Sequence, residues 1–213
     1  MRSPRSVKAL ETFTRVQLSK TFFMRDFLYS EISQIEGIPN IPANPDLAIE
    51  VGKVLCTEIL EPIQARFGRL CIRSALRAPA VNAKGAENKN QYNCARNEWN
   101  RARHIWDEPD RHGKKGAIAC IIVPSYLPYY LQDEKRNWRA IAWWIHDHVP
   151  YSEMEFFSKL CCFSVGWHED PKKTIHAWKP ARTCLTKPGM PNHYGSHKEE
   201  YADWLAQYDG AAA

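Results

Sequence analysis

The chain alternates between helical and strand-like patterns of apolar residues and shows no long run of either kind. Apolar residues recur at helical spacing over residues 22–35 and about 46–66, and each segment predicts a helix. A proline-rich loop over 37–46 separates the two helices. Gly68 should end the second helix, and the apolar residues after it predict a strand over about 69–74.

The rest of the chain predicts a second group of elements. Residues 83–113 are polar, and we expect a long loop there. The remaining elements are a strand over 116–124, a helix over 138–148, a strand over 161–168, a loop-rich segment over 170–193 and a helix over 196–208. Together they predict an α+β fold, with a small antiparallel sheet, helices on one face and long loops around a cleft.

The composition is that of an ordinary globular protein. The chain has 213 residues, of which 44% are hydrophobic and 25% charged, and this length suits one sizeable core. We expect a basic arm over 1–20, one domain over 21–193, and a C-terminal helix and tail over 194–213. The net charge of +5 is compatible with an anionic partner but does not require one.

Two features bear on the compartment. The basic N-terminus is not followed by an apolar segment of the secretory type, and no apolar run reaches the roughly 18 residues that a membrane-spanning helix needs. The cysteines number seven, an odd count, and include no Cys-x-x-Cys pair. This pattern is not that of a disulfide framework, so we expect a reduced, cytoplasmic protein without a membrane partner.

The most informative motif covers residues 72–82, where an apolar run leads to Ser74, Arg77 and, beyond a proline, Asn82. It resembles the S-G-Y-R-S-P-x-x-N segment of the zinc D-Ala-D-Ala carboxypeptidases and L-Ala-D-Glu endopeptidases, whose fold is shared with the hedgehog signalling domain. The resemblance implies that Ser74 and Arg77 line a substrate site. An arginine suits this role because its planar fork holds a carboxylate through two hydrogen bonds. The alternative is a strand-to-loop junction with a solvated arginine.

The order of motifs extends the resemblance over about residues 22–82. The family's F-x-x-x-E-F opening, N-x-P loop and long helix ending before a glycine have counterparts, in the same order, at residues 22–27, 40–42 and 60–68. No single motif is decisive, and the shared order carries the resemblance.

The family holds a catalytic zinc with three protein ligands, which leave one position open for water. By resemblance these are His104, Cys120 and His168, with cysteine replacing the family's aspartate. His112 is the alternative first histidine, but His104 is favoured because Ile105 and Trp106 anchor its neighbourhood. Asp107 and Asp110 are alternative carboxylate ligands. Cys120 has a second interpretation as a buried cysteine of the strand.

The general base departs from the family pattern. The family places its carboxylate three residues before the last histidine, where this chain has Val165. Glu169 and Glu155 are the substitutes, and Glu169 is the predicted base. A thiolate ligand also lowers the Lewis acidity of the metal. Val165 and Cys120 therefore favour an alternative, a non-catalytic binding module on the same scaffold.

A histidine triplet, His146-Asp147-His148, stands at the end of the predicted helix. Residues two apart on a helix do not face one another, so the two histidines are not expected to grip one metal ion. Histidines at this position are favourable because they interact with the helix dipole.

The stretch 84–115 mixes lysines and arginines with Tyr92, Trp99 and Trp106. This mixture is typical of a groove that binds single-stranded nucleic acid, although acidic residues in the same stretch reduce its positive charge.

The resemblance as a whole implies zinc-dependent hydrolysis of a peptidoglycan peptide. Glu169 would act as base, and Arg77 would hold the carboxylate or scissile carbonyl of the substrate. A chain without a secretory signal fits a phage-encoded lysin or an enzyme released by other means. The alternatives are the non-catalytic binding module and the nucleic-acid-binding protein.

Overall fold

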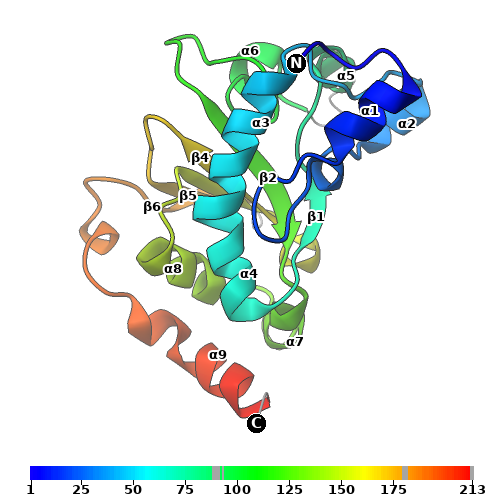
Figure 1. Ribbon diagram of the computed structural model, residues 1–213. Coiled ribbons are helices and arrows are strands. Elements are labelled where there is room, and N and C mark those ends of the chain that lie inside the picture. Colours follow the sequence, from blue (N-terminus) through cyan, green and yellow to red (C-terminus); the bar gives the residue numbers. More distant parts are fainter. Residues whose placement is uncertain (88–91, 93, 179–181, 212–213) are drawn as a thin grey trace.

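A computed structural model of the protein describes residues 1–87, 92, 94–178 and 182–211. Helices surround one six-stranded sheet in this part of the chain, so the predicted α+β class is confirmed (Figure 1). The strands lie in the order β1-β2-β4-β3-β5-β6, with bounds Cys71–Ser74 (β1), Gly116–Ile122 (β2), Glu153–Phe156 (β3), Phe163–His168 (β4), Thr174–Trp178 (β5) and Arg182–Thr186 (β6). The sequence predicted an antiparallel sheet, whereas the observed sheet is mixed, because β3 and β5 run parallel while the other neighbouring pairs are antiparallel.

The long helix predicted over 46–66 is present as three consecutive segments. They are α3 (Pro45–Val54), the π-helical η2 (Leu55–Leu60) and α4 (Glu61–Phe67). The Asn44 side chain accepts from the Leu47 amide and caps the first segment. Pro62 has no amide hydrogen to donate, and the wider π turn directly precedes it. Gly68 ends the helix with a φ of 77°.

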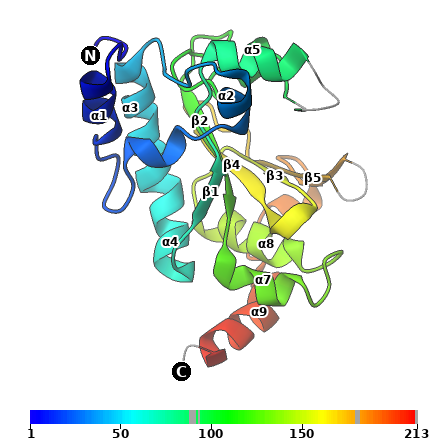
Figure 2. The ribbon, with the colours of Figure 1, turned by 90° about the vertical axis from the view of Figure 1, so that its right-hand side faces the viewer.

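The other helical segments occupy the sheet's flanks and the two ends of the chain (Figure 2). They are α1 (Val7–Thr14), η1 (Met24–Phe27), α2 (Glu31–Glu36), α5 (Pro79–Glu87), α6 (Asn97–Asn100), η3 (Pro124–Tyr126), α7 (Leu127–Tyr130), α8 (Trp138–His148), η4 (Lys159–Cys161), η5 (Pro191–His193) and α9 (Lys198–Ala211). Within the described ranges, no helix is both long and apolar enough to cross a membrane.

Three predicted segments differ from the structure. The helix predicted over 22–35 is split into η1 and α2, because Ser30 caps a new helix. The loop predicted over 83–113 contains α6 and most of α5, and the loop-rich segment 170–193 contains β5 and β6. Residues 88–91, 93, 179–181 and 212–213 of the predicted loops and tail, Lys89 among them, lie outside the described residues.

Both ends of the chain contribute to one core. Phe13 of α1 and Leu18 are buried in the core, so the basic arm predicted over residues 1–20 packs against the rest of the fold. Near the other end, the ring of Trp204 lies 4.5 Å from the ring of Phe67. The core also takes alternate residues from one face of the sheet, including Val165 and Met154. The opposite face of the strands is therefore free to carry polar groups.

Candidate functional site

A row of polar residues crosses the face of the sheet that points away from the main core. In register, the row runs Ser74, Cys120, Ser164, Glu155, His176 and Cys184, from β1 to β6. Residues directly opposite one another on neighbouring strands project to the same face. We call these six residues the polar row. It brings together Ser74 and Cys120, two residues that the sequence predicted for the site.

Charged side chains neutralise one another over the middle of the polar row. The guanidinium of Arg103 lies 2.6 Å from a Glu153 oxygen and 3.9 Å from a Glu155 oxygen. Glu155 also accepts a hydrogen bond of 2.8 Å from the Trp178 indole and lies 3.5 Å from Arg182. The carboxylates of this region are thus occupied by cations of the same chain.

Arg77 lies at the β1 end of the same face and has a different environment. Its side chain is buried, and its Nη1 donates to the Cys94 sulfur at 2.8 Å. Its Nε atom has no hydrogen-bond partner among the described residues, and no carboxylate there pairs with it. Burial lowers the pKa of this guanidinium. Arg77 is therefore a desolvated cation that faces the Cys94 sulfur and has no carboxylate partner among the described residues.

His104 lies beside Arg77, and it is buried together with Ile105 and Trp106, the two residues expected to anchor it. The His104 carbonyl accepts from the Arg77 amide at 2.7 Å, and His104 Nδ1 lies 2.7 Å from the Ala75 carbonyl oxygen. Nδ1 therefore carries the proton, and Nε2 presents its lone pair. Burial, and then the nearby Arg77 charge, hold the pKa of His104 well below its ordinary value, so the ring is neutral.

Cys120 lies beside Ser74 in the polar row, and its thiol keeps its proton. A hydrogen bond with the Cys162 thiol, together with burial, raises the pKa of Cys120 far above its ordinary value. A metal ligand must be the thiolate, whereas the structure favours the thiol. The interpretation of Cys120 as a buried cysteine of the strand describes this state.

The structure does not bring His168 and Glu169 to His104 and Cys120. His168 pairs with Gly116, four residues along β2 from Cys120, which is about 13 Å at the usual rise of a strand. His168 Nε2 faces Asp110 at 3.4 Å, and the Glu169 carboxylate accepts from the Lys115 amide at 2.9 Å. The predicted ligands His104, Cys120 and His168 therefore do not form one metal site in this structure.

The alternatives weighed for the predicted site also have separate positions. His112 is exposed in a turn, where its Nε2 accepts from Arg111. The buried Asp107 accepts from the amides of Ala43 and Asn44 and so fixes the start of α3. Val165, at the position of the family's base, is fully buried on the core side of the sheet.

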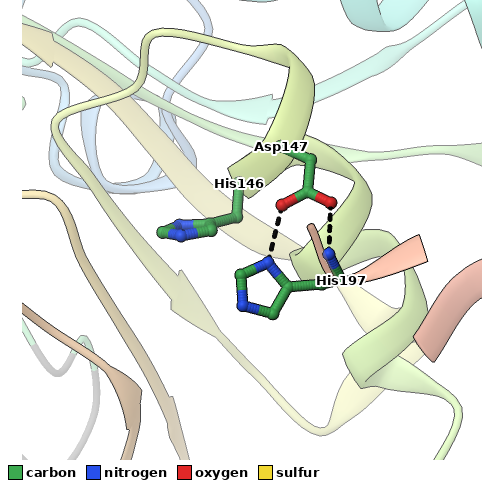
Figure 3. Close-up of side chains that lie close together, drawn as sticks. All are labelled: His146, Asp147 and His197. Carbon is green, nitrogen blue, oxygen red and sulfur yellow. Dashed lines mark hydrogen bonds and ion pairs between the residues drawn. The ribbon is translucent and has the colours of Figure 1, made fainter. Parts of the chain in front are cut away.

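A different group of residues offers metal ligands, at the end of α8 (Figure 3). One ligand atom each from His146, Asp147 and His197 lies within 4.8 Å of the other two, and this group could hold a metal ion. It is the only such group of histidine, cysteine and carboxylate side chains in the part of the chain that the structure describes. His197 directly precedes α9.

Hydrogen bonds hold this group in place. The Asp147 carboxylate accepts from the His197 amide at 2.8 Å and from the Tyr201 hydroxyl at 3.1 Å, and it lies 2.7 Å from His197 Nδ1. Burial and the Asp147 carboxylate raise the pKa of Tyr201 to about 12, so its hydroxyl stays protonated as a donor. Trp143 stacks on the His197 ring with centroids 4.0 Å apart.

The sequence analysis missed this group. The helix does end at His148, as predicted, and His146 and His148 do not act as a pair. The third member is instead His197, fifty residues beyond Asp147, where no spacing rule applies. A loop histidine next to a helix start gives no signal of such a partner.

Comparisons with models of protein families, with curated proteins and with solved structures gave no match to this chain.

Proposed function

We propose that this chain is a ligand-binding module, in which the sheet face around Arg77 takes a carboxylate-bearing ligand. The observation that carries the proposal is the buried Arg77 guanidinium, which has a thiol but no carboxylate partner among the described residues. A buried charge is expensive unless an opposite charge compensates it. A ligand carboxylate would supply that charge through two parallel hydrogen bonds.

The resemblance suggests which carboxylate. Peptidoglycan peptides end in free carboxylates, and Ser74 and Arg77 match the family's substrate-binding motif. Ser74 adjoins Cys120 in the polar row, and His104 contacts the backbone of Arg77. These groups provide hydrogen-bond partners near the cation for the rest of a short peptide.

Zinc-dependent peptide hydrolysis is the second proposal, favoured because Ser74, Cys120, Arg77 and His104 gather at one end of the sheet. It requires the Cys120 thiol to ionise on binding zinc, and it requires His168 to leave Asp110 and to cross the distance of about 13 Å that separates it from Cys120 along the strand. It also requires a general base, and Glu169, the predicted base, lies next to His168 just beyond the end of β4, away from Cys120. Zinc content that falls to zero in His168→Ala, together with release of D-alanine from peptidoglycan fragments, would support hydrolysis over binding alone.

Nucleic acid binding has less support. Among the described cations of the 84–115 stretch, four pair with carboxylates of this chain: Lys84, Arg101, Arg103 and Lys115. Cations already paired in this way contribute little to the field that attracts phosphates.

The proposal is tested with two ligands that differ in one charge. N-acetyl-Lys-D-Ala-D-Ala and its C-terminal amide are titrated by calorimetry into the wild type, Arg77→Gln and a control, Arg15→Gln, whose side chain is exposed at the C-terminal end of α1. We expect the acid to bind about tenfold or more tightly than the amide, and Arg77→Gln alone to remove the difference. Equal affinity for acid and amide in the wild type would refute a carboxylate site.

A further inference from the structure

We propose that His146, Asp147 and His197 bind a divalent metal ion of the zinc type, which fastens the C-terminal helix α9 to α8. The inference is independent of the function proposed for Arg77, because the two sites share no residue. Two imidazoles and one carboxylate are a ligand set that zinc accepts, with a further position for water. The atoms that these three residues offer already lie within 4.8 Å of one another.

The closest contact of the group joins two of the proposed ligand atoms. His197 Nδ1 and Asp147 Oδ1 are 2.7 Å apart, and His197 Nε2 lies 3.0 Å from the Asn192 carbonyl oxygen. A carbonyl in this position orients the imidazole ring, so that Nδ1 is directed at the carboxylate. A zinc ion would take the place of the hydrogen between Nδ1 and Oδ1, with the two atoms moving slightly apart, and that hydrogen would leave to solvent as a proton.

His146 has the arrangement typical of a metal-ligating histidine. Its Nε2 lies 2.9 Å from the His193 carbonyl, which takes the ring proton, and its Nδ1 lies 2.7 Å from the Tyr151 hydroxyl. An outer carbonyl that orients the ring in this way is the common second contact of a ligating imidazole. The Tyr151 hydroxyl is the group that the ion would displace from Nδ1.

The outer contacts of Asp147 and the route of entry complete the site. The His197 amide and the Tyr201 hydroxyl both bind Asp147 Oδ2 and leave Oδ1 directed at the imidazole. An open depression lined by Asp147, Gly195, Ser196 and Tyr201 reaches this carboxylate from solvent. An ion therefore has a path to the one charged ligand of the group.

The position of the ligands determines what the ion would do. His146 and Asp147 form the last turn of α8, and His197 directly precedes α9, which packs Trp204 on Phe67. The ion would join these two helices and resist release of the C-terminal segment. Metal binding is thereby coupled to folding of that segment.

The test is a titration of the purified full-length protein with zinc chloride, followed by calorimetry and by thermal unfolding. The site variants are Asp147→Asn and His197→Ala, and His112→Ala is the control, because His112 is exposed. His168→Ala is added to test zinc binding at the peptidase-like position. We expect one zinc per chain and a higher Tm with zinc in the wild type, His112→Ala and His168→Ala. Affinity should fall about tenfold or more in the two site variants, since outer-shell changes alone have that effect.

Two results would overturn the inference. One is the absence of zinc binding in the wild type, and the other is unchanged affinity in both site variants. Loss of zinc in His168→Ala alone would assign the ion to the peptidase-like position and refute the site at α8. Asp147→Asn nearly preserves the shape of the side chain, so it gives the decisive result if His197→Ala fails to fold.

Discussion

The Arg77 region contrasts with the cluster of His146, Asp147 and His197 at the end of α8. The two differ in whether their buried polar groups have hydrogen-bond partners. Arg77 has one thiol partner and a guanidinium nitrogen without any partner among the described residues. In the cluster, both ring nitrogens of His146 and of His197 face oxygen atoms, and Asp147 accepts from two donors besides facing a ring nitrogen.

The difference has a separate physical consequence for each region. A satisfied network fixes the elements that carry it, and the cluster joins α9 to α8 in this way. An unsatisfied buried charge destabilises the fold unless an opposite charge compensates it. The polar groups of the cluster therefore have partners without an added ligand, whereas Arg77 has no carboxylate partner among the described residues.

The largest expected change in stability comes from removing the arginine that does have partners. Arg103→Met leaves Glu153 without its nearest cation and removes one of the two arginines beside Glu155. We expect the free energy of unfolding to fall by ~2 kcal/mol, less than for a fully buried pair because these side chains are partly exposed. Urea unfolding measures this value. An unchanged midpoint of urea unfolding would mean that the ion pairs of Arg103 do not stabilise the fold, and Arg103 and Arg77 would then not differ in their effect on stability.

A smaller loss is expected in the cluster. Asp147→Asn removes the charge that faces His197 and weakens the acceptor of the Tyr201 hydroxyl. Without added metal, we expect a loss of about 1–2 kcal/mol, with exposure of the buried Trp204 detected by its fluorescence. Stability equal to that of the wild type would show that the network does not hold α9.

The pH dependence of the free energy of unfolding tests whether His104 is buried in its neutral form. The folded protein holds the pKa of His104 well below the unfolded value of about 6.5, chiefly through burial. Below that pH the unfolded chain binds more protons than the folded chain, so stability declines as pH falls below about 6.5. Urea unfolding at several pH values should show this decline, and His104→Gln should reduce it. A decline of the same size in His104→Gln would assign it to other groups, such as His146, whose pKa is also lowered by burial.

The smallest effect is expected on the exposed surface. Lys115 and Glu50 form an exposed pair with 2.6 Å between nitrogen and oxygen. Lys115→Ala should leave the urea midpoint of unfolding almost unchanged, because solvent screens such pairs. A clear fall in the midpoint would mean that stability differences between the two regions cannot be attributed to burial.

The sequence predicted elements well where local pattern decides the structure. The helix over 138–148 was predicted at its observed bounds, since its apolar face repeats at helical spacing. Strands β5 and β6 were missed because they lie among prolines and charges, and β5 is stabilised by parallel pairing with the non-adjacent β3. Residue spacing carries no information about such distant pairing.

The candidate site was likewise predicted correctly only where local sequence decides the structure. The motif around Ser74 and Arg77 marked a strand end that the structure places beside His104 and Cys120. The register between β2 and β4 then placed His168 at the other end of the strand. A shift of register cannot be read from the motif alone, because each strand shows only its own alternation of polar and apolar residues.

The central claim is that Arg77 is held without a carboxylate partner so that a ligand can supply one. The direct measurement is the free energy of unfolding of the wild type and of Arg77→Met, with and without N-acetyl-Lys-D-Ala-D-Ala. We predict that Arg77→Met is more stable than the wild type by ~1 kcal/mol or more in the absence of peptide, because it removes an uncompensated buried charge, and that only the wild type gains stability from the peptide. A variant that is less stable than the wild type and responds equally to the peptide would contradict the account.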